Sequence, residues 1–428
     1  MTDYAHTLYI RASWTDFNPQ EDVYGWKIDS NLRAYIEGAY QRNMRLAFRV
    51  VVDSRDKRTE FTPQFVKDAG AKGFMNKGKW SPYSDDPVFQ KYYTKFVKAL
   101  AKDFNDPSKV EFIDGFGLGK WGEYHTMIYS TGDDTPKKAV FNWVTDIYSQ
   151  AFDKVPVVIN YHRWIGAGKD WVDDEHFAAD SEEMLEEAIK KGYSLRHDAF
   201  GMTTYYGSWE RRFAEKYRNI CPIIMEGGWI VKSHNYWQDP RGYRKDSHED
   251  VRRGEFDDSK EAHVNMMDFR FGDTKSWFKD AFDLVRRFLR EGGYRLYPSE
   301  ISLPLEVSKK TPPTIKHCWN NLGWGYCPTN IPQWNQKYKV AFALLDSETN
   351  EVRYTFVDTD TDLSKWIKGS PAEYVFEPDM SKVETGTYVW AVGLVDRSNK
   401  DLVGLDIAAK GDILDSGWLK LSKVSIKK

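Results

Sequence analysis

The chain has 428 residues, which exceeds what one hydrophobic core usually holds, so we expect two domains. Its 61 basic and 64 acidic residues give a net charge of -3. Without a basic excess to neutralise phosphates, nucleic acid is not an expected partner. No apolar run approaches the roughly 18 residues that span a membrane. The first residues show no basic region followed by an apolar stretch, so a signal peptide is either absent or was removed before this numbering begins.

Short apolar runs alternate with amphipathic segments as far as about residue 300. The runs that predict strands are 8–14, 45–52, 110–117, 155–162, 199–206, 222–227 and 264–270. The segments that predict helices are 30–43, 86–104, 137–152, 181–192 and 275–293, with Ser30 and Ser181 as expected N-caps. Near-continuous apolar strands that alternate with helices favour an α/β fold with a covered parallel sheet. Seven of them in one series fit a (β/α)8 TIM barrel better than an open doubly wound sheet.

The pattern changes after residue 298. A proline-rich linker is expected at 298–316, and the short β-rich segments beyond it predict an antiparallel β-sandwich over 317–428. The catalytic barrel then covers 1–297.

Three cysteines are present. Cys221 begins an apolar strand and is expected to be an inert buried thiol. Cys318 and Cys327 either close a small loop in an oxidising compartment or remain unpaired in a reducing one.

Two glutamates, Glu123 and Glu226, each follow the end of a strand-like run. Cleavage of a glycosidic bond uses a pair of carboxyl groups that flank the scissile bond. Trp121, Tyr124 and His125 surround the first glutamate in the sequence, and an aromatic pocket raises a carboxyl pKa, as a general acid requires. Two glycines after the second glutamate leave open space around it.

Two arginines, Arg11 and Arg49, lie inside apolar strands, and a buried arginine must be paired. Its partner is either a structural aspartate or a nucleophilic carboxylate. Asn160, His162 and Tyr205 lie at two further strand ends and could bind hydroxyl groups. Tryptophans in polar or glycine-containing contexts could stack on sugar rings, and these are Trp80, Trp121, Trp164, Trp229 and Trp237.

The segment GLGKWG (117–122) matches the G-x-G-x-x-G pattern of dinucleotide-binding proteins. An NAD-dependent oxidoreductase would need a helix directly after it. We interpret the segment instead as a glycine-rich turn that lets the backbone approach a ligand. No Cys/His cluster has the spacing of a zinc site, and no cofactor or metal is expected.

Residues 14–50 resemble the stretch W-x-x-x-x-P-x-x-x-x-Y-x-W-x-x-(I/L)-D…R-(V/L)-x-x-R of clan A glycoside hydrolases, especially those similar to family 42 β-galactosidases. GLGKWGEYH resembles the fourth-strand end that carries the acid/base of this clan, and PIIMEGG resembles the seventh-strand end that carries the nucleophile. HCWNNLGWGYCP and YVWAVGLVD resemble the β-sandwich appended to relatives of these enzymes. Two departures prevent a transfer of specificity: Gly122 replaces the usual Asn, and MMDFRFG lacks the usual Trp.

The resemblance implies that the seven strands occupy barrel positions two to eight. We therefore predict that the first barrel strand is missing from this chain, and 57–85 is the best internal segment to fill the gap.

We expect a retaining glycosidase that acts on a β-linked oligo- or polysaccharide, with Glu123 as acid/base and Glu226 as nucleophile. The alternatives are a carbohydrate-binding protein without catalysis, whose sandwich is the working module, and the oxidoreductase. A secreted or periplasmic location is expected, and a cytoplasmic location is the alternative. The expected substrate-binding residues are Arg11, Trp14, Arg49, Trp121, Tyr124, His125, Asn160, His162, Tyr205 and Trp229.

Overall fold

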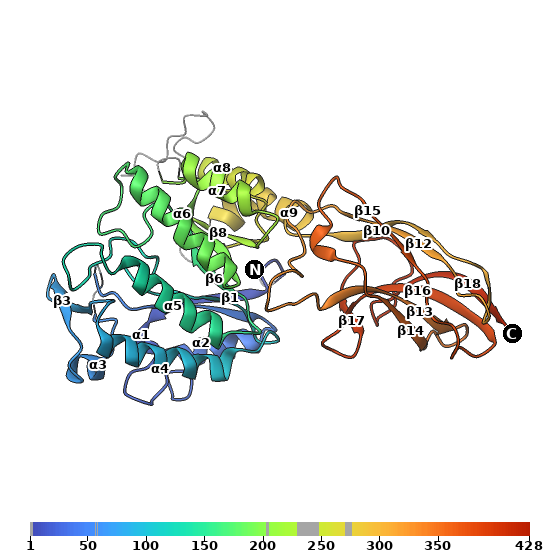
Figure 1. Ribbon diagram of the computed structural model, residues 1–428, viewed down its shortest axis with the longest axis horizontal. Helices are drawn as coiled ribbons and strands as arrows, with labels where there is room; N and C mark the ends of the chain where they lie inside the picture. Colours follow the sequence, from blue (N-terminus) through green and yellow to red (C-terminus); the bar gives the residue numbers. More distant parts are fainter. Residues whose placement is uncertain (1–2, 56, 58, 203–204, 229–247, 270–275) are drawn as a thin grey trace. The chain divides into compact units, whose positions relative to one another are not determined.

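The computed structural model describes residues 3–55, 57, 59–202, 205–228, 248–269 and 276–428 (Figure 1). The chain divides into two compact units. The first contains Met1–Tyr217, Ile223–Ala262 and Met267–Val285, and the second contains Arg218–Pro222, His263–Met266 and Arg286–Lys428. None of the described helices is both long and apolar enough to cross a membrane.

A seven-stranded parallel sheet forms the centre of the first unit. Its strands, in spatial order, are β1 (Thr7–Ser13), β2 (Arg45–Val51), β5 (Val110–Asp114), β6 (Val157–Asn160), β7 (Tyr193–Phe200), β8 (Ile223–Gly227) and β9 (Met266–Met267). Spatial order equals chain order, as for consecutive strands of a barrel, whereas a doubly wound sheet reverses direction. The predicted α/β class and the number of seven strands are confirmed, although one strand lies at other residues than predicted, and the sheet is a half-barrel.

Among the described residues, β1 pairs only with β2 and no strand joins β1 to β9. The expectation that 57–85 fills this gap is wrong. That segment contains a hairpin, β3 (Gly73–Asn76) with β4 (Lys79–Pro82), which forms a separate two-stranded sheet. A missing first strand stays a prediction.

Helices follow the strands along the first unit, and α4 packs beside α5 and α5 beside α6 (Figure 1). The longer ones are α2 (Asn31–Tyr40), α4 (Pro87–Phe104), α5 (Lys137–Ala151), α6 (Glu175–Lys190), α7 (Ser208–Tyr217), α8 (His248–Glu261) and α9 (Phe282–Glu291). Short helices complete the set, namely α1 (Trp14–Phe17), α3 (Gln64–Asp68) and the π-helical turn Ser276–Asp280.

The helix starts agree with the sequence signals in α2 and differ in α6. Ser30 caps α2 by accepting a hydrogen bond from the backbone of Arg33. Ser181 is not the cap of α6, because Asp174 caps this helix by accepting hydrogen bonds from two backbone N–H groups. The hydroxyl of Ser181 instead accepts a hydrogen bond from the Ile165 backbone, so it anchors the preceding loop.

Strand β7 begins six residues before the predicted run 199–206. The run fails as a strand because Gly201, with φ of 84°, ends β7, and the backbone of Tyr205 then donates to the carbonyl of Met202 in a turn. The actual strand has the sequence YSLRHDAF, whose charged residues face polar partners.

The second unit contains two sheets. One has the order β10 (Leu296–Ser302), β12 (Ile315–Asn321), β15 (Ala372–Phe376). The other has the order β11 (Glu306–Ser308), β18 (Leu419–Lys427), β16 (Gly386–Asp396), β13 (Tyr338–Asp346), β14 (Val352–Asp358), and β17 (Leu402–Leu405) pairs with β16. One core joins them, in which Trp319 of β12 stacks on Trp366 and packs with Phe342 and Trp390 of the larger sheet.

The segment 298–316, expected as a linker, contains most of β10 and all of β11. Pro298 fits in β10 because this strand lies at the edge of its sheet, where a missing N–H costs no ladder bond. The register also shifts between Pro298 and Glu300.

All three cysteines are free. Cys318 and Cys327 do not form the bridge that one of the two alternatives required. On β12 the side chains of His317 and Trp319 point into the core, so Cys318 between them points away from it. Cys327 lies inside the core.

Candidate active site

A layer of polar side chains crosses the parallel sheet. Arg11 of β1 is in register with Arg49 of β2, which is in register with Asp114 at the end of β5. Side chains in register on neighbouring strands share one face of a sheet, so these three lie side by side. Tyr9 points to the same face, and its hydroxyl donates to Asp114 at 3.1 Å.

Arg49 connects three carboxyl groups. Its side chain is fully buried, and its Nε donates to Asp114 Oδ2 at 2.6 Å. Nη1 contacts Glu123, and Nη2 lies 3.4 Å from Glu226 Oε2. A buried guanidinium requires such partners. The sequence left a structural aspartate and a nucleophilic carboxylate as alternatives, and Arg49 contacts an aspartate as well as both candidate glutamates.

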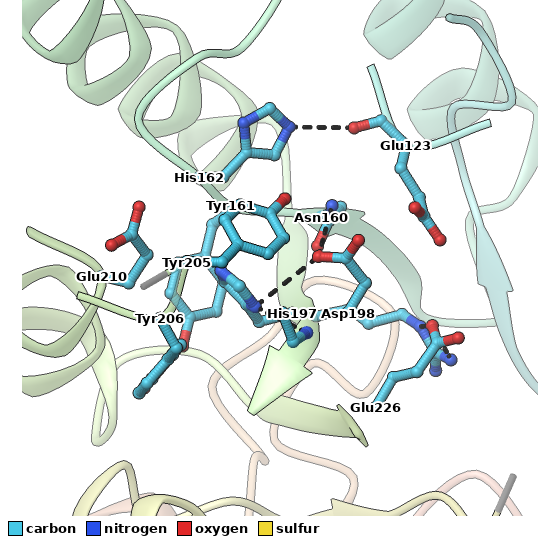
Figure 2. Close-up of polar contacts among 12 residues, drawn as sticks. Glu123, Asn160, Tyr161, His162, His197, Asp198, Tyr205, Tyr206, Glu210 and Glu226 are labelled. Carbon is cyan, nitrogen blue, oxygen red and sulfur yellow. Dashed lines mark hydrogen bonds and ion pairs between the residues drawn. The ribbon is translucent and has the colours of Figure 1, made fainter. Parts of the chain in front are cut away.

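Arg11 bridges the two glutamates. Its Nη1 lies 3.4 Å from Glu123 Oε1 and 3.8 Å from Glu226 Oε1. The side chain is partly exposed, so this nitrogen lies where the buried site meets solvent. One nitrogen atom within 4 Å of both carboxylates means that the two glutamates face a common space (Figure 2).

Glu226 of β8 has a third cationic partner. Arg196 of β7 donates to Glu226 Oε2 from Nη2 at 2.7 Å and from Nε at 3.2 Å. The same guanidinium also contacts Asp268, just after β9, at 3.0 Å. Arg11, Arg49 and Arg196 therefore compensate the charge of this carboxylate from three sides.

Glu123 lies in the loop after β5 and is buried. His162 Nε2 lies 2.9 Å from its backbone carbonyl and holds the loop (Figure 2). Burial raises the pKa of Glu123 to about 7, and the negative charge of Asp198 adds to this, although Arg11 and Arg49 oppose it. At neutral pH this carboxyl group therefore holds a proton for a large share of the time.

The loop that carries Glu123 has an unusual backbone. Three of its glycines, Gly117, Gly119 and Gly122, have positive φ, and so do Trp121 and Tyr124. Non-glycine residues pay for this conformation, and such strain concentrates at functional sites.

The glycine pattern of this loop does not bind a dinucleotide in the expected way. No helix follows GLGKWG directly, and the next helix, α5, begins only at Lys137. The oxidoreductase alternative required that helix, so it is wrong. A tight turn beside the carboxylates agrees with the second interpretation of the segment.

Next to Glu123, a buried histidine faces two aspartates. His125 Nδ1 lies 3.0 Å from Asp170, and Nε2 lies 3.7 Å from Asp198 and hydrogen-bonds to Tyr205. Burial alone would lower the pKa of His125, but the two aspartates outweigh it and raise the pKa to about 10. The ring stacks on His162 at 3.9 Å, and burial together with this neighbour lowers the pKa of His162.

Asp198 of β7 lies at the centre of the polar cluster (Figure 2). Asn160, the last residue of β6, donates its side-chain N–H to Asp198 Oδ1 at 3.2 Å. Burial would raise the pKa of Asp198, yet hydrogen bonding and charge from His125 hold it well below its usual range. This aspartate is therefore an ionised neighbour of Glu123.

One group of side chains in the described part of the chain has the spacing of a metal site. Ligand atoms of Glu123, His125 and Asp198 lie within 4.8 Å of one another. Two guanidinium groups, those of Arg11 and Arg49, already contact this glutamate, and their positive charge opposes a divalent cation there. The donor set does not suit a metal ion.

Two residues expected at the site belong to the core. Trp14 is fully buried, with its ring against aromatic rings of α4 such as Tyr93 at 5.2 Å. Tyr124 packs on Phe116 and Phe141 beneath the loop. Both expectations are wrong because these rings fill the space between the sheet and its helices.

The tryptophans are distributed differently from the expectation. Trp80 and Trp164 are buried, and Trp121 is partly exposed, with its ring 5.7 Å from that of His125. Trp229 and Trp237 lie outside the described residues. The structure brings the other expected residues together in one cluster, and these are Arg11, Arg49, His125, Asn160, His162, Tyr205 and the two glutamates.

Five residues of this cluster were not anticipated: Tyr9, Asp114, Asp170, Arg196 and Asp198. A charged residue inside an apolar strand was the signal that pointed to Arg11 and Arg49. The same signal is present in VEFIDGFG for Asp114 and in YSLRHDAF for Arg196 and Asp198.

No family model and no curated protein matches this sequence. Solved structures show weak similarity. Endo-glycoceramidase II from Rhodococcus sp. is 14% identical, with 88% of this chain and 90% of that chain covered and a TM-score of 0.38. A trimodular endoglucanase of subfamily GH5_4 is 12% identical over 92% of this chain and 70% of that chain, with a TM-score of 0.40. The exo-β-1,4-mannosidase Op5Man5 from Opitutaceae bacterium strain TAV5 is 12% identical, with 65% of this chain and 48% of that chain covered and a TM-score of 0.35. Similarity at this level assigns neither an activity nor a substrate to this chain.

Proposed function

We propose that the protein is a glycosidase that cleaves a β-linked oligo- or polysaccharide by a retaining mechanism. One observation carries the proposal: two buried glutamates, one in the loop after β5 and one on β8, lie within 4 Å of the same arginine nitrogen. Arg11 and Arg49 contact both glutamates, but the surroundings differ in two respects: Arg196 contacts Glu226, and the negative charge of Asp198 acts on Glu123. When the surroundings favour the protonated form of one carboxyl group and the ionised form of the other, the first is the acid and the second is the nucleophile.

In this mechanism Glu123 donates its proton to the oxygen of the leaving sugar, and Glu226 attacks the anomeric carbon. A covalent glycosyl-enzyme results. Glu123, now ionised, removes a proton from water, which attacks the anomeric carbon and releases Glu226. The β-linkage rests on the resemblance in sequence, and the contact of Arg11 with both glutamates supports the short separation of about 5–5.5 Å that retention requires.

A panel of aryl glycosides and oligosaccharides tests the proposal. We expect Glu226→Gln to lower kcat by about 10⁴-fold or more on every substrate, because the covalent step is lost. Glu123→Ala should lose about 10²–10⁴-fold on substrates with poor leaving groups and much less on activated ones, and azide should restore its turnover. The exposed Asp133→Asn, in the loop before α5, serves as the matched charge-removal control.

The stereochemistry is read by NMR of the first sugar released, which retention predicts to be the β-anomer. Wild-type turnover in both glutamate variants would contradict the assignment. Binding of oligosaccharides without any turnover would favour the carbohydrate-binding alternative.

A further inference from the structure

Among the described tryptophans of the first unit, Trp171 is the one that is largely exposed. Trp171 is 55% accessible, whereas Trp80 and Trp164 are buried. It lies in the loop between β6 and α6, with φ of 64°. A bulky residue rarely adopts this conformation, so the surrounding loop must hold it there.

The loop around Trp171 is fixed on both sides. The indole N–H of Trp164 donates to the carbonyl of Val172 at 2.7 Å. On the other side, Asp170 accepts from the Thr126 hydroxyl at 2.9 Å and pairs with His125. The adjacent residues are therefore tied to the site, while the indole itself remains exposed.

The ring of Trp171 extends the polar cluster outward on the side of Glu123. It meets the ring of Tyr205 edge to face at 4.7 Å and that of Trp164 at 5.1 Å. The Tyr205 hydroxyl hydrogen-bonds to His125, which follows Glu123 by two residues. Arg11 and Arg49 contact both glutamates, whereas Arg196 of β7 contacts Glu226 on the other side.

We infer that Trp171 is a stacking platform for a sugar residue on the leaving-group side of the scissile bond. The C–H face of a pyranose ring is apolar and packs on an indole face, and an indole held in advance loses little entropy on binding. The side follows from the role of Glu123, which protonates the leaving oxygen, so this inference rests on the proposed function. The ligand class is an oligosaccharide with at least one sugar beyond the cleaved bond.

The test compares Trp171→Ala and Trp171→Phe with Tyr35→Ala, which removes a similarly exposed aromatic ring from α2. Binding of β-linked gluco-, galacto- and manno-oligosaccharides of two to four units is measured by calorimetry in the Glu226→Gln background. Kinetics in the wild-type background compare each hydrolysed oligosaccharide with the aryl glycoside of the same sugar. We expect Trp171→Ala to weaken oligosaccharide binding about tenfold. Trp171→Phe should retain most of the affinity, and Tyr35→Ala should have no effect.

In the kinetics, the loss in kcat/KM should be at least several-fold larger for the oligosaccharide than for the aryl glycoside. Equal losses on both substrates, or wild-type affinity in Trp171→Ala, would overturn the platform while hydrolysis by Glu123 and Glu226 stands. A wild-type protein that neither binds nor hydrolyses any member of the panel would overturn both.

Discussion

Asp198 adds to the effect of burial in raising the pKa of Glu123, the proposed acid/base. It is a partly buried carboxylate beside Glu123, and two like charges in close proximity disfavour joint ionisation. His125 settles which of the two holds the proton, because it pairs with Asp198 and stabilises its ionised form. The proton therefore stays on Glu123, where the proposed chemistry needs it.

Asp198→Asn should move the alkaline limb of the pH–rate profile to lower pH. The charge of Asp198 raises the pKa of Glu123, so its removal lets Glu123 lose its proton earlier, and the active protonated form disappears at lower pH. The limb, near pH 7 in the wild type, is measured as kcat/KM from pH 4 to 9 on an unactivated glycoside. Asp103→Asn on α4, where the aspartate pairs with Lys27, is the control and should keep the wild-type limb. An unchanged limb in Asp198→Asn would show that this aspartate does not tune the acid.

The Glu123 loop depends on close backbone contact at Gly117. A Cβ atom there would lie 2.5 Å from the Tyr93 hydroxyl and closer still to the Val50 carbonyl, and φ is +80°. Gly70 also has a positive φ, of +94°, but open space surrounds it, so Gly70→Ala isolates the conformational cost of about 1–2 kcal/mol. Gly117→Ala should lower the free energy of unfolding by about 1–3 kcal/mol more than Gly70→Ala, because the core must also shift. Urea unfolding of both variants measures the difference. Equal losses of unfolding free energy would mean that the loop accommodates the added Cβ atom at no further cost.

Strands in which apolar side chains dominate could be predicted from sequence, and the bounds of β7 could not. The runs at β1, β2, β5, β6 and β8 are mainly apolar and contain at most two charged residues each, such as Arg49 and Asp114. In β7 burial depends on partners from other strands: Arg196 needs Glu226, and Asp198 needs Asn160. Local sequence does not contain those partners, so the bounds of the strand escaped prediction together with the site residues it carries.

Aromatic residues were the least predictable part of the site. Trp14, Trp164 and Trp171 each have a charged residue within two positions, yet only Trp171 of these three is exposed. Whether a ring is exposed depends on which other segments of the folded chain cover it, and the local sequence does not show this. The two glutamates could be predicted because the ends of consecutive parallel strands converge at one edge of a sheet.

At the scale of the molecule, the first unit concentrates buried titratable groups around one site, and this makes its stability dependent on pH. His125 has a pKa of about 10 in the folded state, above the ordinary 6.5. Its stabilising contribution is therefore complete below pH 6.5 and is lost as the pH rises toward 10. Glu123 acts in the same direction, because its pKa rises from 4.5 to about 7 and folding favours its protonated form. Asp170 and Asp198 have lowered pKa values, so their contribution is present above about pH 4 and is lost in more acidic solution.

His162 and His197 have lowered pKa values in the folded state, so their contribution is present above about pH 6.5 and is lost in more acidic solution. We therefore expect the unfolding transition of this unit to occur at its highest temperature near pH 7 and to fall steadily from pH 7 to 9. Calorimetry over this range measures it. His125→Gln should be less stable than the wild type at pH 6, since it leaves Asp170 and Asp198 without their cation, and its transition should change little between pH 7 and 9. His176→Gln on α6 removes an exposed histidine and should keep the full wild-type slope. A wild-type transition that stays level from pH 7 to 9, or a slope that persists in His125→Gln, would place the pH dependence elsewhere in the molecule.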